Sequence, residues 1–220
     1  GNSVAARALV EEVLADDSGH VEAVKLKATW LILDDQTGDA ITLLRSAIDQ
    51  NPRDASLMTL LAQAYERDGN HDLMGELLSQ AVDASGKAPA ESIRYAQYLA
   101  SDSKFVPAEG VLIDALRIAP GDVALLVPLG QIYVAMKDWA RAETVAQQLE
   151  AINEPAAAND LTALRTAILE GQQKNAEAST YLEQLAGTEG AKIDAKIAVL
   201  RNKLSNGQAA EAVTYAAKLV

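Results

Sequence analysis

The sequence contains no cysteine among its 220 residues. This absence excludes disulfides, thiolate catalysis, and zinc or iron–sulfur sites built on cysteine. Aromatic residues are also scarce, at 4%, whereas 49% of the residues are hydrophobic, mostly Ala, Leu, Val and Ile. Because Ala and Leu favour helices and β-sheet proteins use more Val, Thr and aromatic residues, this composition predicts an all-α fold.

No apolar run approaches the roughly 20 residues that a membrane-spanning helix needs. The longest run, residues 123–128, is short and is soon followed by Gly130 and Gln131. The net charge is −12, and binding to nucleic acid depends on Lys and Arg that neutralise phosphates. We therefore expect a soluble chain that neither inserts directly into a membrane nor binds nucleic acid.

The same helix-like pattern occurs twice in the chain, in residues 40–52 and again in residues 108–120. Each copy has Ala first, Leu at the fifth position, Ala at the eighth and Pro at the thirteenth. A period of 34 residues extends this pattern along the chain, and a fixed period of this length indicates stacked supersecondary units. Steps of 34 residues from Ala40 reach Ala6, Ala108, Ala142, Ala176 and Ala210, and the one departure from Ala in this column is Met74.

Each period is predicted to form two helices. In residues 55–88, Met58, Leu61, Ala62 and Tyr65 have the spacing of one helix face. Residues 68–70 then form a turn, and a second segment of helical periodicity follows. One such hairpin cannot bury its apolar faces alone, so neighbouring hairpins are expected to stack. Ala81 and Ala115 are expected at close crossings of these helices.

These residues resemble the tetratricopeptide repeat, which has a large residue, Leu, a small residue and Tyr on its first helix. The resemblance covers nearly the whole chain and implies a right-handed α-solenoid of about 12–13 helices. In one copy the matching residues are Met58, Leu61, Ala62, Tyr65, Gly69 and Ala81. In another they are Leu126, Leu129, Gly130, Tyr133, Asp138 and Ala142, and Pro52 and Pro120 close two of the units.

The period predicts a single solenoid over residues 1–220, with a possible seam at residues 150–160, where Pro155 lies and the register loosens. Residues 3–17 are expected to form only a second helix, which is half a repeat. Full repeats are expected at residues 21–54, 55–88, 89–122 and 123–156. Degenerate or truncated repeats are expected at residues 157–189 and 190–220.

The sequence has no pattern typical of an enzyme. It contains no nucleophile elbow, no phosphate-binding loop and no dinucleotide fingerprint. Its two histidines, His20 and His71, both fall at predicted turns. We therefore expect no catalytic residue, no cofactor and no metal site.

The resemblance implies that the first helices of the repeats line a concave groove that holds a partner segment. The face opposite each buried stripe predicts the groove residues, which carry three cations and no acid. An ordinary solvated face is the alternative. The predicted residues are Lys25, Thr29, Ile32, Thr59, Gln63, Arg67, Ile93, Arg94, Gln97, Val127, Gln131 and Val134.

The function predicted from these features is a non-catalytic scaffold that binds a protein or peptide segment in its groove. The alternative is an assembly module whose truncated ends, residues 3–17 and 208–220, pack end to end on further repeats or on a second copy as a homodimer. The resemblance suggests a piece of a bacterial multi-repeat protein. The compartment stays open between the bacterial cytoplasm and the periplasm, because the chain opens Gly-Asn-Ser rather than with Met, and any signal or anchor of the parent protein would have been removed with the part before it.

Overall fold

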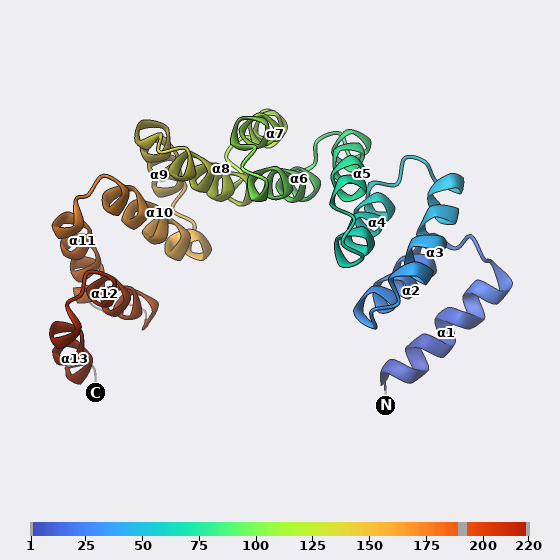
Figure 1. Ribbon diagram of the computed structural model, residues 1–220, viewed down its shortest axis with the longest axis horizontal. Helices are drawn as coiled ribbons and strands as arrows, with labels where there is room; N and C mark the ends of the chain where they lie inside the picture. Colours follow the sequence, from blue (N-terminus) through green and yellow to red (C-terminus); the bar gives the residue numbers. More distant parts are fainter. Residues whose placement is uncertain (1, 189–192, 219–220) are drawn as a thin grey trace. The chain divides into compact units, whose positions relative to one another are not determined.

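The computed structural model describes residues 2–188 and 193–218, with only the backbone of Asn2. These residues form thirteen α-helices and one short 3-10 helix, and they contain no strand (Figure 1). The all-α prediction is therefore confirmed. The chain forms two compact units, residues 1–119 and residues 120–220.

The first unit begins with a single helix, which three helix pairs follow. In each pair a turn of three residues joins the first helix to the second, and the two helices pack against each other. The helices are α1 (Asn2–Asp16), α2 (Val21–Leu33) with α3 (Thr37–Gln50), α4 (Ala55–Arg67) with α5 (His71–Ala84), and α6 (Pro89–Ser101) with α7 (Phe105–Ile118).

The second unit contains three further helix pairs with the same three-residue turns. A 3-10 helix, η1 (Pro155–Ala157), precedes the second of these pairs. The helices are α8 (Val123–Ala135) with α9 (Trp139–Ile152), α10 (Ala158–Gly171) with α11 (Asn175–Gly187), and α12 (Ile193–Ser205) with α13 (Ala209–Ala217).

The six turns within the pairs share one backbone conformation. The central residue has a positive φ angle, which ends the preceding helix in the left-handed conformation. In the second turn, for example, the N–H of Gly69 donates to the carbonyl of Glu66 at 3.2 Å, and that of Asn70 donates to Tyr65 at 2.9 Å. Only two of the six central residues are Gly, and they are Asp35, Gly69, Ser103, Lys137, Gln173 and Gly207.

Alanine and leucine columns of the period form the core of both units. Ala40, Ala108 and Ala142 are completely buried. Ala81 and Ala115 are completely buried too, as expected for residues at close helix crossings. Leucines fill the larger spaces beside these alanines, and Leu44, Leu78 and Leu112 are completely buried. These residues therefore have the packing roles that the period predicts. The prediction is wrong for Ala6, Ala176 and Ala210 of the same column, which are exposed. In the last two helix pairs the buried alanines are Ala178 and Ala212, two residues beyond the positions that a period of 34 predicts.

Three glycines allow a bulky side chain of a neighbouring helix to approach the backbone closely. Gly75 of α5 lies against the ring of Tyr98 in α6. In the second unit, Gly130 of α8 lies against Leu164 of α10, and Gly171 at the end of α10 lies against Trp139 of α9. A Cβ atom at any of these glycines would overlap its neighbour, so each close approach requires glycine.

Each of the four expected full repeats contains one first helix and one second helix. The division of the chain into these repeats stays a prediction. The expected seam at residues 150–160 lies inside the second unit. There Asn153 has a φ angle of 53°, η1 follows, and Ala157 is the only buried residue between 151 and 160. Between Lys137 and Gln173 the turns are 36 residues apart instead of 34, so this segment holds two additional residues.

The terminal helices keep apolar side chains exposed. In α1, Val4 is 74% exposed and Leu9 is 61% exposed, although Val10 is buried. In α13, Val213 is 70% exposed, and Ala212 is the one buried residue of this helix. Residues 219 and 220 of the predicted terminal half-unit lie outside the described residues.

Candidate functional site

The predicted groove residues of the first unit come from α2, α4 and α6, the first helices of its three pairs. Their positions are equivalent when they are counted back from the central residue of each turn. Thr29, Gln63 and Gln97 each lie six residues before that residue, whereas Lys25 and Thr59 lie ten before it. We call the surface that carries these positions the first-helix face.

Lys25 is largely engaged within the protein. Its ammonium lies 3.0 Å from Asp54 and 3.1 Å from Glu22. Burial lowers the pKa of Lys25, but the hydrogen bonds to these carboxylates outweigh that effect and hold the pKa above its usual value. Burial alone would likewise raise the pKa of Asp54, and the bonds from Lys25 and from the N–H of Leu57 hold it below its usual value.

Ile32 does not belong to the first-helix face, and its prediction as a groove residue is wrong. It is buried in the core of the first unit. The buried residues of α2 are Ala23, Val24, Ala28 and Ile32, and Ile32 lies four residues after Ala28, so it extends the buried stripe of this helix. Lys27, at a position where the repeat usually has Leu, is not buried and pairs with Glu11 of α1 at 2.8 Å.

The three predicted cations of the first-helix face differ in their partners. Lys25 is paired with two acids, and Nε of Arg67 lies 3.6 Å from Asp35. Arg94 makes no ion pair with any described residue. Its guanidinium contacts the side-chain amide of Gln63 on α4, oriented so that the amide oxygen accepts from it at 2.5 and 2.6 Å. Arg94 is therefore the predicted cation with charge left to offer a partner.

A hollow of about 490 Å³ opens beside Arg94 in the first unit. Gln97 and Ile93 of α6 line it together with Arg94, and Glu66 of α4 forms part of its rim. Thr29 is exposed, but its hydroxyl donates to the carbonyl of Lys25 at 2.8 Å. The hydroxyl oxygen of Thr59 is buried and therefore not accessible to a partner. The structure thus places Arg94 and Gln97 together on this hollow, and Gln63 contacts Arg94 without lining it.

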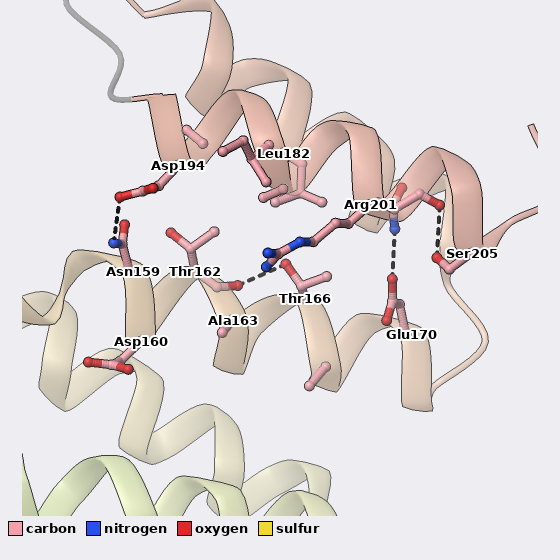
Figure 2. A pocket seen from close by; sticks show the side chains of 15 residues that line it. Asn159, Asp160, Thr162, Ala163, Thr166, Glu170, Leu182, Asp194, Arg201 and Ser205 are labelled. Carbon is pink, nitrogen blue, oxygen red and sulfur yellow. Dashed lines mark hydrogen bonds between the residues drawn. The ribbon is translucent and has the colours of Figure 1, made fainter. Parts of the chain in front are cut away.

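In the second unit, Gln131 is exposed on α8, and Val127 and Val134 are half-buried. The period of 34 loses its register beyond residue 150, so it predicts no groove residues in the helix pairs that follow. Counting back from the turn residues Gln173 and Gly207 restores the register and reaches four further positions. They are Ala163, Ala167, Ile197 and Arg201, and all four line a hollow between α10 and α12 (Figure 2).

The described residues contain no group of three or more side chains placed to hold a metal ion. His20 caps α2, where its Nδ1 accepts the N–H of Ala23 at 3.3 Å, and His71 is exposed at the start of α5. Among the same residues, no helix combines the length and the apolar character that crossing a bilayer requires.

Comparison with known proteins supports the fold. No protein-family model and no curated protein matches the sequence significantly. The structure is similar to that of PilF from Pseudomonas aeruginosa, with 17% identity, 90% of this chain and 89% of that chain covered, and a TM-score of 0.63. A tetratricopeptide repeat protein from Parabacteroides merdae is similar at 15% identity, 90% and 78% coverage, and a TM-score of 0.71.

A third similar structure is that of YrrB, which is described as a tetratricopeptide-repeat protein with an unusual peptide-binding site. It has 10% identity, 84% of this chain and 95% of that chain covered, and a TM-score of 0.61. At such identities the likeness concerns the fold, and it confirms the resemblance seen in the period of the sequence. The chain is therefore a helical repeat protein with the tetratricopeptide-repeat fold.

Proposed function

We propose that this chain is a non-catalytic scaffold that binds an extended segment of a partner protein along its first-helix face. The observation that carries this proposal is the hollow of the first unit, where Arg94 has no acidic partner among the described residues. Side-chain amides and a guanidinium donate hydrogen bonds to the carbonyl groups of an extended backbone. Two neighbouring helices supply such groups, from Gln63, Arg94 and Gln97. We therefore expect the site to bind the main chain of the partner, with little dependence on the partner's side chains.

The similar structures favour the same class of function. YrrB is described as having a peptide-binding site, and its fold is that of this chain. A helical repeat surface suits such a role because successive first helices present side chains at regular intervals to an extended segment. The partner is a protein or peptide, since the net charge of −12 disfavours nucleic acid.

The test is a selection of binders from a random nonapeptide library on the immobilised full chain, followed by Kd measurements. The variant Arg94→Ala with Gln97→Ala removes two groups of the hollow. Its matched control is Gln80→Ala with Arg117→Ala, which removes the same residue types from the second helices α5 and α7. We expect the first pair to weaken binding of selected peptides about tenfold or more and the control pair to leave it unchanged. Failure to select any peptide, or equal loss in both pairs, contradicts the proposal.

The rival function is end-to-end assembly, which the exposed apolar residues of α1 and α13 favour. A second copy packed on these helices would cover Val4, Leu9 and Val213. Light scattering separates the two functions, because assembly gives a dimer that Leu9→Asp or Val213→Asp disrupts. Groove binding leaves a monomer whose melting temperature rises with peptide concentration.

A further inference from the structure

A hollow of about 610 Å³ in the second unit lies between the first helices α10 and α12 (Figure 2). Leu182 of α11, which is 2% exposed, lines it from the helix behind. A hydrogen bond bridges α10 and α12 near each end of the hollow. One joins Asn159 to Asp194 at 3.0 Å, and the other joins Asn202 to Glu170 at 2.7 Å. These bridges frame an open space between the two helices.

The side chains along the walls explain why the space is not filled. α8 packs against α10 in the same unit, whereas α10 and α12 make little direct contact. Ala163 and Ala167 on α10 face Ala195 and Ala198 on α12, and none of them is long enough to span the gap. Asn202 at the inner end is 4% exposed, and its amide oxygen also accepts from the Ser179 hydroxyl at 2.7 Å, so this end is fixed.

Arg201 is the feature of this hollow that points to a ligand. Its exposed side chain extends from α12 across the hollow towards Thr162 and Thr166 of α10 (Figure 2). It makes no ion pair with any described residue. Of the three acids that line the hollow, Asp194 and Glu170 are bonded to amides, and Asp160 lies away from Arg201 (Figure 2). The two threonine hydroxyls donate to carbonyls of their own helix. The five N–H donors of the guanidinium are therefore available to an incoming acceptor.

We propose that this hollow binds a partner peptide by an internal Asp or Glu side chain, whose carboxylate pairs with Arg201. A guanidinium binds a carboxylate through two parallel hydrogen bonds, and the alanines beside it accommodate short apolar neighbours of that residue. The proposal rests on the proposed peptide-binding function and gives it a second contact, distinct from the hollow beside Arg94.

The source of the carboxylate follows from the shape and charge of the hollow. Ala163, Ile197 and Arg201, which lie between the two bridging hydrogen bonds, are exposed, so the hollow is open to solvent along its length. A chain can therefore pass across it, which favours a side-chain carboxylate over a chain terminus. The acids of the rim and the net charge of −12 repel a run of acidic residues. The expected segment carries a single acid among small or aliphatic residues.

The experiment uses the nonapeptides selected on the full chain, resynthesised with an acetylated N-terminus and an amidated C-terminus. Each Asp or Glu is replaced in turn by Asn or Gln, and Kd is measured for the wild type and for Arg201→Gln, Arg201→Lys and Arg94→Gln. Lys196→Gln is the matched control, because it removes one positive charge from the same helix outside the hollow. Melting temperatures verify that the variants are folded.

We expect Arg201→Gln to weaken the acidic peptides about tenfold, and Arg201→Lys to weaken them less. The amide peptides should bind both wild type and Arg201→Gln with the same reduced affinity, and Lys196→Gln should bind as the wild type does. Peptides that bind through Arg94 alone, with no acid dependence and no response to Arg201→Gln, overturn this inference and leave the proposed function intact. If the library yields no binder, both fail.

Discussion

Gly75 of α5 lies directly against the ring of Tyr98 of α6, with no space between them for a Cβ atom. Both residues are in the first unit, at the junction between its second and third helix pairs. The positions one period away from Gly75 hold Ile41 and Glu109 instead of glycine, so this contact is particular to this junction. It makes the junction sensitive to one methyl group.

Gly75→Ala is expected to lower the free energy of unfolding by about 1–3 kcal/mol, because the new methyl group overlaps the Tyr98 ring. Urea denaturation measures the change. Tyr98→Leu in the same chain should recover part of the loss, which a double-mutant cycle shows as a coupling between the two sites. Gly110→Ala in α7 is the control, since nothing lies near its Cβ position, and it should stabilise the helix by up to about 1 kcal/mol. Equal effects at both glycines would contradict the close contact.

The turns provide a matched pair of opposite substitutions. Gly69 and Ser103 occupy the same central position and have φ angles of 78° and 57°. Gly69→Ala should destabilise the protein by about 1 kcal/mol, because a side chain is strained in this conformation. Ser103→Gly should relieve that strain and raise the melting temperature, although the greater freedom of glycine in the unfolded chain offsets part of the gain. A lower melting temperature for Ser103→Gly would show that the serine is not strained.

Asp54 should contribute pH-dependent stability through its bond to Lys25. The pKa of Asp54 is lower in the folded protein than its usual value, so its contribution is complete above the pKa of the unfolded chain, about 3.9. The contribution is lost as the pH falls through the folded pKa. Asp54→Asn keeps a cap for α4 and should cost about 0.5–1 kcal/mol at pH 7 but little at pH 2–3. Asp49→Asn on α3 is the control. If Asp54→Asn lowers the free energy of unfolding by the same amount at every pH, the ion pair is contradicted.

The last helix is expected to depend on a buried lysine. Lys203 of α12 has a side chain only 10% exposed, and its ammonium lies 2.6 Å from Glu183 of α11 and 3.6 Å from Glu211 of α13. Because Ala212 is the one buried residue of α13, this charge network supplies much of its attachment. Lys203→Ala should therefore accelerate hydrogen exchange of the amides of residues 210–217, and Lys196→Ala should not. Unchanged protection of α13 would show that apolar contacts suffice.

Hydrogen exchange also tests the predicted seam. Residues 150–160 contain one buried side chain, and α10 contributes Leu164 and Ile168 to the buried core. Because buried apolar area sets the strength of a repeat interface, we expect amides of residues 160–218 to exchange faster than those of residues 55–120. Equally slow exchange in the two segments would mean that the Leu164–Gly130 contact and the Arg165–Glu150 ion pair, at 2.7 Å, hold this junction as firmly as the others.

The helical fold follows from the sequence because the period places small and large residues in fixed columns, and from residue 40 to residue 149 those columns are the buried ones. The site was less accessible to this reasoning. Ile32 was predicted in the groove, but it lies four residues after Ala28 and extends the buried stripe of α2, and this spacing was the available signal. The ion pairs of Lys25 and Arg67 join neighbouring helix pairs, so no periodicity within one helix reveals them.

Arg201 was missed for a different reason. Two additional residues between Lys137 and Gln173 displace it from the column of Thr29, Gln63 and Gln97. The left-handed residue at the centre of each turn is a better reference point than the period, because an insertion between pairs does not change its distance from the preceding helix. Gly207 is the signal that identifies this position for Arg201 in the sequence itself.

The close contacts at Gly75, Gly130 and Gly171 have a consequence for the order of the repeats. The contact of Gly75 with Tyr98 joins the pair α4–α5 to the pair α6–α7, whereas the contacts of Gly130 with Leu164 and of Gly171 with Trp139 both join the pair α8–α9 to the pair α10–α11. The contact surfaces of these two junctions therefore differ, even though the helices share one pattern. A chain with two of these repeats exchanged would keep every helix-forming segment and would still bring a bulky side chain against a residue with no room for it. Rearrangement of this array is thus limited at its junctions, and its repeats are not interchangeable parts.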